Sequence, residues 1–318
     1  MNEFTIIKRF FANHLASRTD VAISIGDDAA IVTVPTQHQL VITTDTLVNG
    51  IHFPEDTTPY DIGYKSLAVN LSDLAAMGAT PAWATLALTL PTAEQLWLSE
   101  FCRGFFELAD YHAVQLIGGD LTHGPLTITV QLHGLIPCNQ ALLRSGAKTG
   151  DSIYVTGTLG DAGLGLCFLQ KQILLPPQHQ TKPLQQFYHP EPRLPLGEKL
   201  RHIAHAAIDI SDGFAADLMH ILERSQKGAI INVDNLPLSA AMLATLSADH
   251  AISLALTAGE DFELCFTAPA EKHAQIMHLA TQHCPITQVG IVTEQAGLIL
   301  QYRDGSKYHG KTQGYQHF

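Results

Sequence analysis

The chain has 318 residues, of which 46% are hydrophobic and 15% charged, so it is long enough for two domains with sizeable cores. Its net charge of −12 and its singly scattered basic residues argue against a nucleic-acid backbone as partner. Five cysteines without a CxxC pair and the lack of a signal-peptide pattern in MNEFTIIKRF predict a reduced, cytoplasmic setting.

The first half of the chain alternates helical and strand patterns. Apolar spacing predicts helices from Phe4 to Leu15, from Pro59 to Met77 and from just after Thr92 to about His112, and strands at 39–46, 84–90, 114–120 and 126–135. Thr58 is placed to cap the second helix, which ends at Gly78. Thr92 with Gln95 predicts a capping box for the third. The weakly charged run 75–93 contains prolines and threonines, which disfavours a membrane span.

A break rich in turn formers and charge, PCNQALLRSGAKTGD, divides the chain into domains at 1–137 and 138–318. The patterns of the second half predict strands at 151–157, 208–210, 229–233, 262–268, 286–292 and 297–302, and helices at 159–170, 214–225, 238–247 and 270–283. Residues 174–195 are expected to form a Pro- and Gln-rich loop. Interleaved helices and strands with some short links predict an α+β fold with antiparallel pairing.

Acidic residues recur at what are expected to be the polar ends of apolar segments. They lie in the motifs GDDAA, TTDT, NLSDLAAMG, IGGD and AIDISDG, as Asp27, Asp28, Asp45, Asp73, Asp120, Asp209 and Asp212. Each one alone is more often a helix cap or a turn residue. Acids used so uniformly instead favour Mg²⁺, which prefers oxygen ligands and substrate phosphates. Because a buried, unpaired carboxylate costs several kcal/mol, roughly, we expect these acids to converge on cations in one pocket.

Several phosphate-handling and hydrolytic motifs do not occur in the sequence, among them GxxxxGK[ST], HExxH, GxSxG and the kinase catalytic loop. The glycines of GTLGDAGLG, residues 157–165, are not spaced as a dinucleotide fingerprint and indicate close packing at a helix start. Among the histidines, His52 stands out because it follows the Asp45 strand. Arg144, in RSGAKTGD, is the cation best placed for a phosphate, although a surface ion pair is its ordinary role.

Taken in order, the motifs resemble those of the thiamine-monophosphate kinase family over nearly the whole chain. They are GDDAA, TTDTLVNGIHF, DIGYKSLAVNLSDLAAMGATP, GGD, RSGAKTGD, VTGTLGDAGLGL, IDISDG and AGEDFEL. That family is part of the aminoimidazole-ribonucleotide synthetase-like superfamily, so the resemblance implies two α+β domains with mixed or antiparallel sheets and helices on one face. It further implies a homodimer paired through the N-terminal domains, and ATP-dependent phosphorylation of thiamine monophosphate to thiamine diphosphate with several Mg²⁺ ions.

The resemblance also implies roles for individual residues. The metal ligands fall on Asp28, Thr43, Thr44, Asp45, Asp73, Asp120, Asp209 and Asp212. The ATP contacts fall on Gly119, Asp120, Arg144 and Ser211, and the substrate contacts fall on His52, Glu260 and Tyr315. Asp45, Asp120 and Arg144 are the catalytic candidates. We expect no general base, because the second pKa of a phosphate monoester is roughly 6 and the acceptor oxygen is already anionic.

Two alternatives remain at this stage. Another ATP-using enzyme of the superfamily, of the cyclo-ligase or selenophosphate synthetase type, is disfavoured by the lack of a Gly-rich N-terminal segment with a reactive cysteine. The stretch TDTLVNGIHF also stands where the cyclo-ligase has a DGVGTK-like motif. A non-catalytic metal-nucleotide sensor is disfavoured by the near-complete set of acids, because a sensor has no need of all of them.

Overall fold

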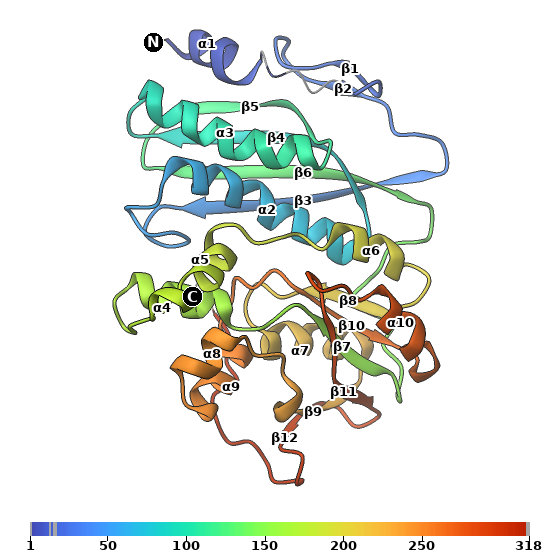
Figure 1. Cartoon of the computed structure of the whole chain (residues 1–318). Helices are drawn as coiled ribbons and strands as arrows, with labels where there is room; N and C mark the ends of the chain where they lie inside the picture. The colour runs from blue at the N-terminus through green and yellow to red at the C-terminus, as the bar shows by residue number, and fades with distance from the viewer. Residues whose placement is uncertain (1, 13, 15–17, 316–318) are drawn as a thin grey trace. The chain divides into compact units, whose positions relative to one another are not determined.

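The computed structural model describes residues 2–12, 14 and 18–315, and it divides the chain into two compact units (Figure 1). Unit 1 takes the residues up to Leu74 together with Ala79–Asn139. Unit 2 takes Ala75–Gly78 together with the residues from Gln140 onward. The last turn of one long helix therefore groups with unit 2, which the sequence pattern did not predict.

Unit 1 is built on a four-stranded sheet in the order β3-β6-β4-β5. The strands are β3 (His38–Val48), β4 (Thr80–Leu90), β5 (Gln115–His123) and β6 (Thr127–Pro137). β6 pairs antiparallel with β3 and β4, whereas β4 and β5 are parallel. The helices α2 (Pro59–Met77) and α3 (Gln95–Tyr111) both cover the same face of this sheet (Figure 1). The mixed sheet with helices on one face is confirmed here.

The start of α2 follows the sequence, whereas the start of α3 does not. The Thr58 hydroxyl accepts a hydrogen bond from the Asp61 backbone N–H at 3.2 Å, and α2 ends before Gly78, whose φ is +69°. The predicted capping box at Thr92 is wrong, because α3 begins at Gln95 with Glu94 as its N-cap and without a side-chain cap bond. Gln95 is thus the first helical residue and not the third, so its side chain cannot complete the box.

The N-terminal segment forms short elements. The predicted helix appears as α1 (Glu3–Ile6) and the π-helical turn η1 (Ile7–Phe11), while its predicted end at Leu15 lies outside the described residues. Strand β1 (Val21–Ile23) pairs antiparallel with β2 (Ile31–Val32). Strands of three and two residues are too short to show an alternating pattern, so the sequence did not reveal this hairpin.

Unit 2 contains a six-stranded sheet in the order β12-β9-β11-β7-β10-β8. Its strands are β7 (Ser152–Thr156), β8 (Ala206–Asp209), β9 (Gly228–Asn232), β10 (Leu264–Ala268), β11 (Ile286–Thr293) and β12 (Gly297–Gln301). All neighbours in this sheet are antiparallel except β12 and β9. The short links between the last strands favoured antiparallel pairing, and most of the sheet follows that expectation.

The helices of unit 2 include some that the sequence pattern missed. The helices are α4 (Asp161–Leu169), α5 (Thr181–Tyr188), α6 (Leu194–Leu200), α7 (Phe214–Ser225), α8 (Ala240–Thr245), α9 (Ala248–Thr257) and α10 (His273–Leu279), with 3₁₀ turns at 177–179, 233–235 and 270–272. The predicted loop at 174–195 is wrong over α5 and the start of α6. The prolines there fall in the first turn of each helix, a position that tolerates proline, and Phe187 is buried.

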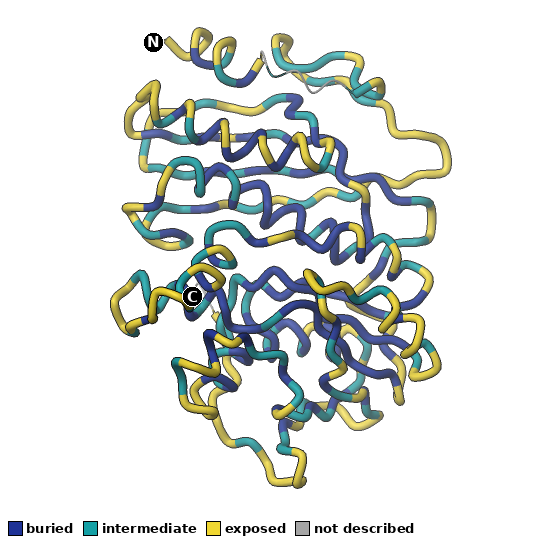
Figure 2. Tube along the Cα trace, viewed as in Figure 1, coloured by how far each residue is buried: buried dark blue, intermediate teal, exposed yellow. Residues whose placement is uncertain are grey.

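Burial follows the layers of each unit. Helix α2 is buried along most of its length, and so are the inner strands of the unit 2 sheet (Figure 2). In contrast, β3 at the edge of the unit 1 sheet is only partly buried. Across the described part of the chain, the search for a helix both long and apolar enough to traverse a bilayer finds none.

Candidate functional site

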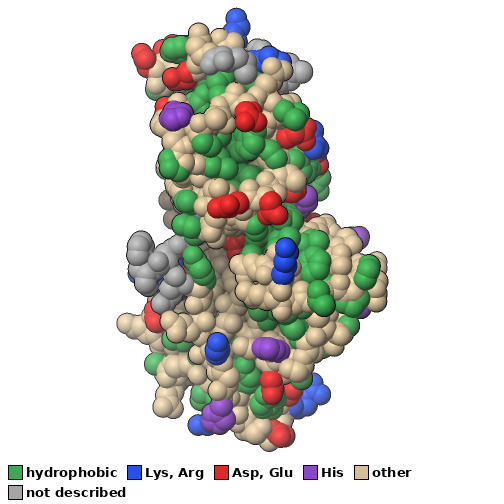
Figure 3. Space-filling model, turned by 90° about the vertical axis from the view of Figure 1, so that its left-hand side faces the viewer, with side chains coloured by type: hydrophobic (Ala, Val, Ile, Leu, Met, Phe, Trp, Pro, Cys, Tyr) green, Lys and Arg blue, Asp and Glu red, His purple; other side chains and the backbone are tan. Residues whose placement is uncertain are grey.

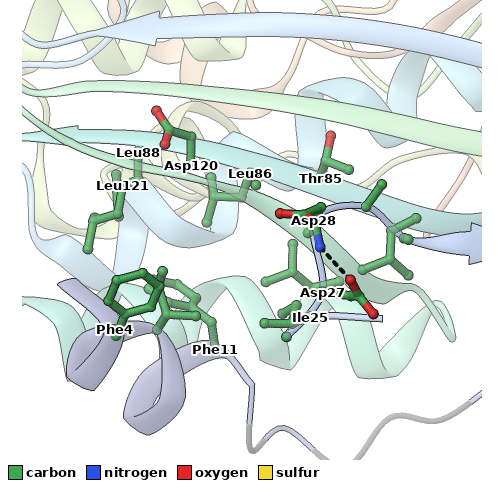
Figure 4. Close-up of a pocket in the computed structure, with 18 residues that line it drawn as sticks. Phe4, Phe11, Ile25, Asp27, Asp28, Thr85, Leu86, Leu88, Asp120 and Leu121 are labelled. Carbon is green, nitrogen blue, oxygen red and sulfur yellow. Dashed lines mark hydrogen bonds between the residues drawn. The ribbon is translucent and has the colours of Figure 1, made fainter. Parts of the chain in front are cut away.

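A cavity of about 740 Å³ in unit 1 lies beside the edge strand β5. Its lining combines carboxylates and glycines with apolar side chains, namely Phe4, Ile7, Phe11, Ile25, Gly26, Asp27, Asp28, Ala29, Ala30, Thr85, Leu86, Leu88, Leu116, Ile117, Gly118, Gly119, Asp120 and Leu121. Figure 4 shows the rings of Phe4 and Phe11 on one side and the carboxylate of Asp120 on the other. The motifs GDDAA and GGD, which are far apart in the sequence, therefore share one cavity.

Asp28 reaches this cavity from the connection between β1 and β2. Its backbone N–H donates to the Asp27 carboxylate at 2.9 Å, so Asp27 shapes the loop. The hairpin is anchored by Asp20, which accepts from Arg18 Nε at 3.0 Å and from Trp83 Nε1 at 3.1 Å. The Arg18 hydrogen bond is the main cause that lowers the pKa of the Asp20 carboxyl, so this anchor is ionised at neutral pH.

Gly119 brings Asp120 to the cavity through a backbone conformation that favours glycine. Its φ is +155°, and a Cβ atom there would lie 1.9 Å from the carbonyl oxygen of Leu86 on the neighbouring strand. Asp120 is exposed, and its carboxylate accepts from the Thr122 hydroxyl at 2.8 Å. The predicted ATP contacts Gly119 and Asp120 therefore lie in β5 just after an irregularity in its pairing with β4, and the Asp120 side chain is open.

A second group of predicted ligands lies on β3. The Thr43 hydroxyl donates to the Asp73 carboxylate of α2 at 2.5 Å, and Asp45 shares the face of Thr43 because side chains alternate along a strand. The Thr44 hydroxyl lies on the opposite face, where it accepts from Gln131 Nε2 at 3.3 Å. The structure thus brings Thr43, Asp45 and Asp73 to the same face and separates the Thr44 side chain from them.

These two groups lie at opposite edges of the sheet. Asp45 pairs with Val130, Val130 with Leu86, and Leu86 with Gly119, so three strand spacings, roughly 14 Å, separate the two edges at this level. Among residues 2–12, 14 and 18–315, no group of three or more His, Cys, Asp or Glu side chains is close enough to hold a metal ion. Within unit 1 these acids therefore form two groups, and their convergence on cations in one pocket stays a prediction.

The expectation that these acids occupy the ends of helices and strands is wrong for three of them. Asp45 lies inside β3, Asp73 inside α2 and Asp120 inside β5. The surrounding apolar residues were interpreted as segments that stop at the acid. Both strands instead continue past their acids because they stay paired with a neighbour: Thr46–Val48 with β6 and Leu121–His123 with β4.

His52 lies in the turn after β3. Its Nδ1 accepts from the Val48 backbone N–H at 3.0 Å, and its carbonyl accepts from the Lys65 ammonium at 3.4 Å. With Nδ1 acting as an acceptor, the neutral ring carries its proton on Nε2. The turn therefore fixes both the position and the tautomer of this histidine.

In unit 2, several of the predicted residues lie in or beside the turn between β8 and α7. Its backbone N–H groups at Ser211, Asp212 and Gly213 all donate to one carboxylate oxygen of Asp217, at 3.0, 3.0 and 3.1 Å. Burial raises the pKa of Asp217 to about 7, and the backbone hydrogen bonds oppose that rise.

The carbonyl groups of the same turn hold two more segments. The Ser211 carbonyl accepts from the Glu260 backbone N–H at 2.8 Å, and the Asp212 carbonyl accepts from the Tyr315 backbone N–H at 2.9 Å. Tyr315 is 49% exposed, while Glu260 is half-buried with a φ of +72°. The structure therefore brings Ser211, Asp212, Glu260 and Tyr315 together around one turn, and their roles stay predictions.

The AGEDFEL segment is held by buried polar groups. Asp261 is fully buried and accepts from the Gly160 backbone N–H at 2.7 Å. Burial raises the pKa of Asp261. Glu263 forms a two-pronged ion pair with Arg193, at 2.6 and 2.7 Å, and accepts from the Thr156 hydroxyl. These contacts fix the backbone on both sides of Glu260.

Two predicted residues of unit 2 stand apart from the turn itself. Asp209 is buried at the end of β8, where it is paired with Leu264 of β10. Arg144 is exposed in a loop whose neighbour Leu143 accepts from the Ala207 backbone N–H at 3.0 Å. Since Ser211 follows the other end of β8, the backbone at Arg144 lies roughly 10 Å or more from the turn.

The surface of unit 1, like the lining of its cavity, combines apolar and acidic side chains. On the face seen in Figure 3, apolar side chains lie together with acidic ones among them.

The sequence pattern did not single out Asp217, Asp261 or the Arg193–Glu263 pair of unit 2. The only available signal was the presence of further acids beside the predicted ones, in SDGFAAD and GEDFE, and that pattern does not say which acid turns inward.

Comparison with known proteins gives consistent matches over both units. The family model of the AIR synthase related protein, N-terminal domain, matches residues 26–136, and that of the C-terminal domain matches residues 148–303. The chain is 46% identical to the thiamine-monophosphate kinase of Escherichia coli, over 99% of this chain and 98% of that protein.

Solved structures agree with these matches. The crystal structure of thiamine-monophosphate kinase from Stenotrophomonas maltophilia is 44% identical with a TM-score of 0.88, and the match covers 97% of this chain and 98% of that chain. A structure of AaThiL complexed with AMPPCP and TMP is 31% identical with a TM-score of 0.78, covering 93% and 92% of the two chains.

Proposed function

This chain belongs to the thiamine-monophosphate kinase family, within the AIR synthase related proteins, and we propose that it transfers the terminal phosphoryl group of ATP to thiamine monophosphate. The observation that carries this proposal is the 46% identity to the Escherichia coli enzyme over 99% of the chain. The shared cavity of Asp28, Gly119 and Asp120 supports the same function.

The reaction forms one P–O bond and breaks another. A phosphate oxygen of thiamine monophosphate attacks the terminal phosphorus of ATP, the bond to the bridging oxygen breaks, and ADP leaves with that oxygen's electrons. The acceptor is already anionic near neutral pH, since its second pKa is roughly 6, so no side chain has to remove a proton. The protein must position two anions in line and offset their repulsion.

We propose that Mg²⁺ ions bind to oxygen donors in both acid groups of unit 1 and in unit 2. The candidates are ligands predicted from the sequence: Asp28 and Asp120 at the cavity, Thr43, Asp45 and Asp73 at β3, and Asp209 and Asp212 in unit 2. Thr44 is the one predicted ligand whose hydroxyl lies on the opposite face of β3. Carboxylate and hydroxyl oxygens suit this hard cation. Groups of only two carboxylates also fit it, because Mg²⁺ is usually held by one or two carboxylates plus substrate phosphates. Bound cations would neutralise charge on the transferring group.

For the nucleotide, we propose that the cavity of unit 1 accepts ATP. Its volume of about 740 Å³ is within the range of small-molecule sites. The phosphates would lie at Asp28, Gly119 and Asp120, and the base would pack on the apolar side of Phe4 and Phe11. Arg144 and the Ser211 hydroxyl remain proposed phosphate contacts.

For the acceptor, we propose that Glu260 faces the thiazolium cation or the pyrimidine amine, and that Tyr315 packs against a ring. The His52 turn leaves the ring proton on Nε2, which suits a hydrogen bond to the substrate phosphate. The backbone N–H groups of Glu260 and Tyr315 both donate to carbonyl groups of one turn. This common support favours a common substrate for the two side chains.

We also propose a cytoplasmic homodimer in which the open face of the unit 1 sheet is covered by a second copy. On this face, Leu40 and Ile42 of β3 are 40% and 55% exposed, and apolar side chains on an open sheet face favour association. Light scattering of the purified chain tests this directly, with Ile42→Lys expected to shift the mass from dimer to monomer.

The proposed activity is tested by incubating the purified chain with ATP, Mg²⁺ and thiamine monophosphate. We expect ADP and thiamine diphosphate in equal amounts, with no product in excess chelator and full recovery when Mg²⁺ is restored. Turnover of other phosphate acceptors without any thiamine diphosphate would reject the proposal.

A further inference from the structure

The turn that carries Ser211 and Asp212 connects a strand to a helix through a glycine, which is the local geometry of many phosphate-binding loops. In such loops the backbone N–H groups point at the ligand. Here the three N–H groups of residues 211–213 donate to the Asp217 carboxylate from within α7. An internal anion thus occupies the position that a ligand phosphate would otherwise take.

This arrangement leaves the turn only its side chains and carbonyl groups for other contacts. The carbonyl groups of Ser211 and Asp212 are both used, because Ser211 accepts from the Glu260 N–H and Asp212 accepts from the Tyr315 N–H. The turn is therefore the common support of one predicted metal ligand and two predicted substrate contacts. A shift of its backbone would move all three.

The cost of this carboxylate argues against a simple capping role. Asp217 is 2% exposed, and Asp212, which raises its pKa further, lies on the turn that it holds. Serine or asparagine can cap a helix start without burying a charge. Here one carboxylate oxygen accepts from three successive backbone N–H groups, whereas a serine or asparagine cap accepts from the N–H of the second or third helical residue.

We propose that Asp217 is a positioning residue, which fixes the backbone of the 211–213 turn so that Asp212, Glu260 and Tyr315 keep their positions relative to metal and acceptor. This inference rests on the proposed function for the identity of those ligands. Asp217 itself touches neither ligand in this role, so it acts only through the turn.

The experiment compares Asp217→Ala, Asp217→Asn and a matched control, Asp161→Asn, in the thiamine diphosphate assay. Asp161 is also fully buried and accepts two hydrogen bonds, from Thr158 and Ser239, but it does not hold the turn. For each variant we measure kcat, the KM for thiamine monophosphate, the Mg²⁺ concentration at half-maximal rate, and the folded fraction.

For Asp217→Ala we expect kcat to fall by about 100-fold. The Mg²⁺ concentration at half-maximal rate should rise by about tenfold, as for other residues that orient metal ligands. Asp217→Asn should recover part of both losses, because its amide oxygen still accepts from the turn. Asp161→Asn should lower the rate only in proportion to its folded fraction, with the Mg²⁺ dependence unchanged.

The inference is overturned if Asp217→Ala keeps the wild-type Mg²⁺ dependence and loses rate only in proportion to unfolding. If that variant does not fold, Asp217→Asn decides: unchanged hydrogen exchange at residues 211–213 together with unchanged Mg²⁺ dependence overturns it. Wild-type protein that makes no thiamine diphosphate refutes the proposed function instead. Hydrogen exchange in Asp217→Asn against Asp161→Asn then still decides whether Asp217 fixes the turn.

Discussion

The two units use acidic side chains in opposite ways. In unit 1, Asp28 and Asp120 face a cavity; the Asp28 backbone N–H donates to Asp27, and the Asp120 carboxylate accepts from the Thr122 hydroxyl. In unit 2, Asp217, Asp261 and Glu263 are buried and accept several hydrogen bonds from the protein itself. The difference teaches that a carboxylate in an apolar segment can be a ligand site or a structural support, depending on what surrounds it.

The largest effect on stability is expected from breaking the buried ion pair of unit 2. Arg193→Met leaves Glu263 buried without its cation, which should destabilise the protein by about 3–5 kcal/mol. Chemical denaturation measures this loss. The exposed pair Arg103–Glu100 is the control, since Glu100→Gln should leave the stability nearly unchanged. Equal effects in the two variants would remove the contrast between buried and exposed acids.

Replacing the acids of unit 1 should lower the reaction rate and leave the stability unchanged. Asp120→Asn and Asp45→Asn are each expected to lower kcat by about 100-fold or more, because they weaken the binding of the cations that would offset the repulsion between two phosphates. Neither should lower the thermal midpoint, since removing a carboxylate from an acidic protein relieves repulsion. Normal turnover in one variant alone would show that only one of the two acid groups takes part in the reaction.

A smaller effect is expected where an acid of unit 1 is structural. Asp20 has a pKa lowered chiefly by Arg18, so its folded-state pKa lies below its unfolded value. The stabilisation is therefore fully present above about pH 4 and is lost as pH falls through the folded-state pKa. Asp20→Asn should cost about 1 kcal/mol at pH 7 and much less at pH 2.5, as read from unfolding curves. A constant difference across this pH range would contradict the assignment.

Much of the fold follows from local pattern, whereas the roles of the acids do not. Thr58, Pro59 and Gly78 mark the ends of α2 by capping and backbone geometry, which are local properties. The division of Asp45 and Asp120 between two sheet edges depends on strand order, which no short motif encodes. Asp212 lies in the turn before α7 and Asp217 in the first turn of α7, and the sequence does not show that the N–H groups of the turn donate to Asp217.

The most direct measurement is the binding of AMPPCP with and without Mg²⁺, by calorimetry, to the wild-type protein and to Asp28→Asn. If exposed acids recruit cations that in turn hold phosphates, the wild type should bind tightly only with Mg²⁺, and Asp28→Asn should bind about tenfold or more weakly. Equal affinity in the absence of Mg²⁺, or an unchanged affinity in the variant, would contradict a metal-dependent phosphate site at the cavity of unit 1.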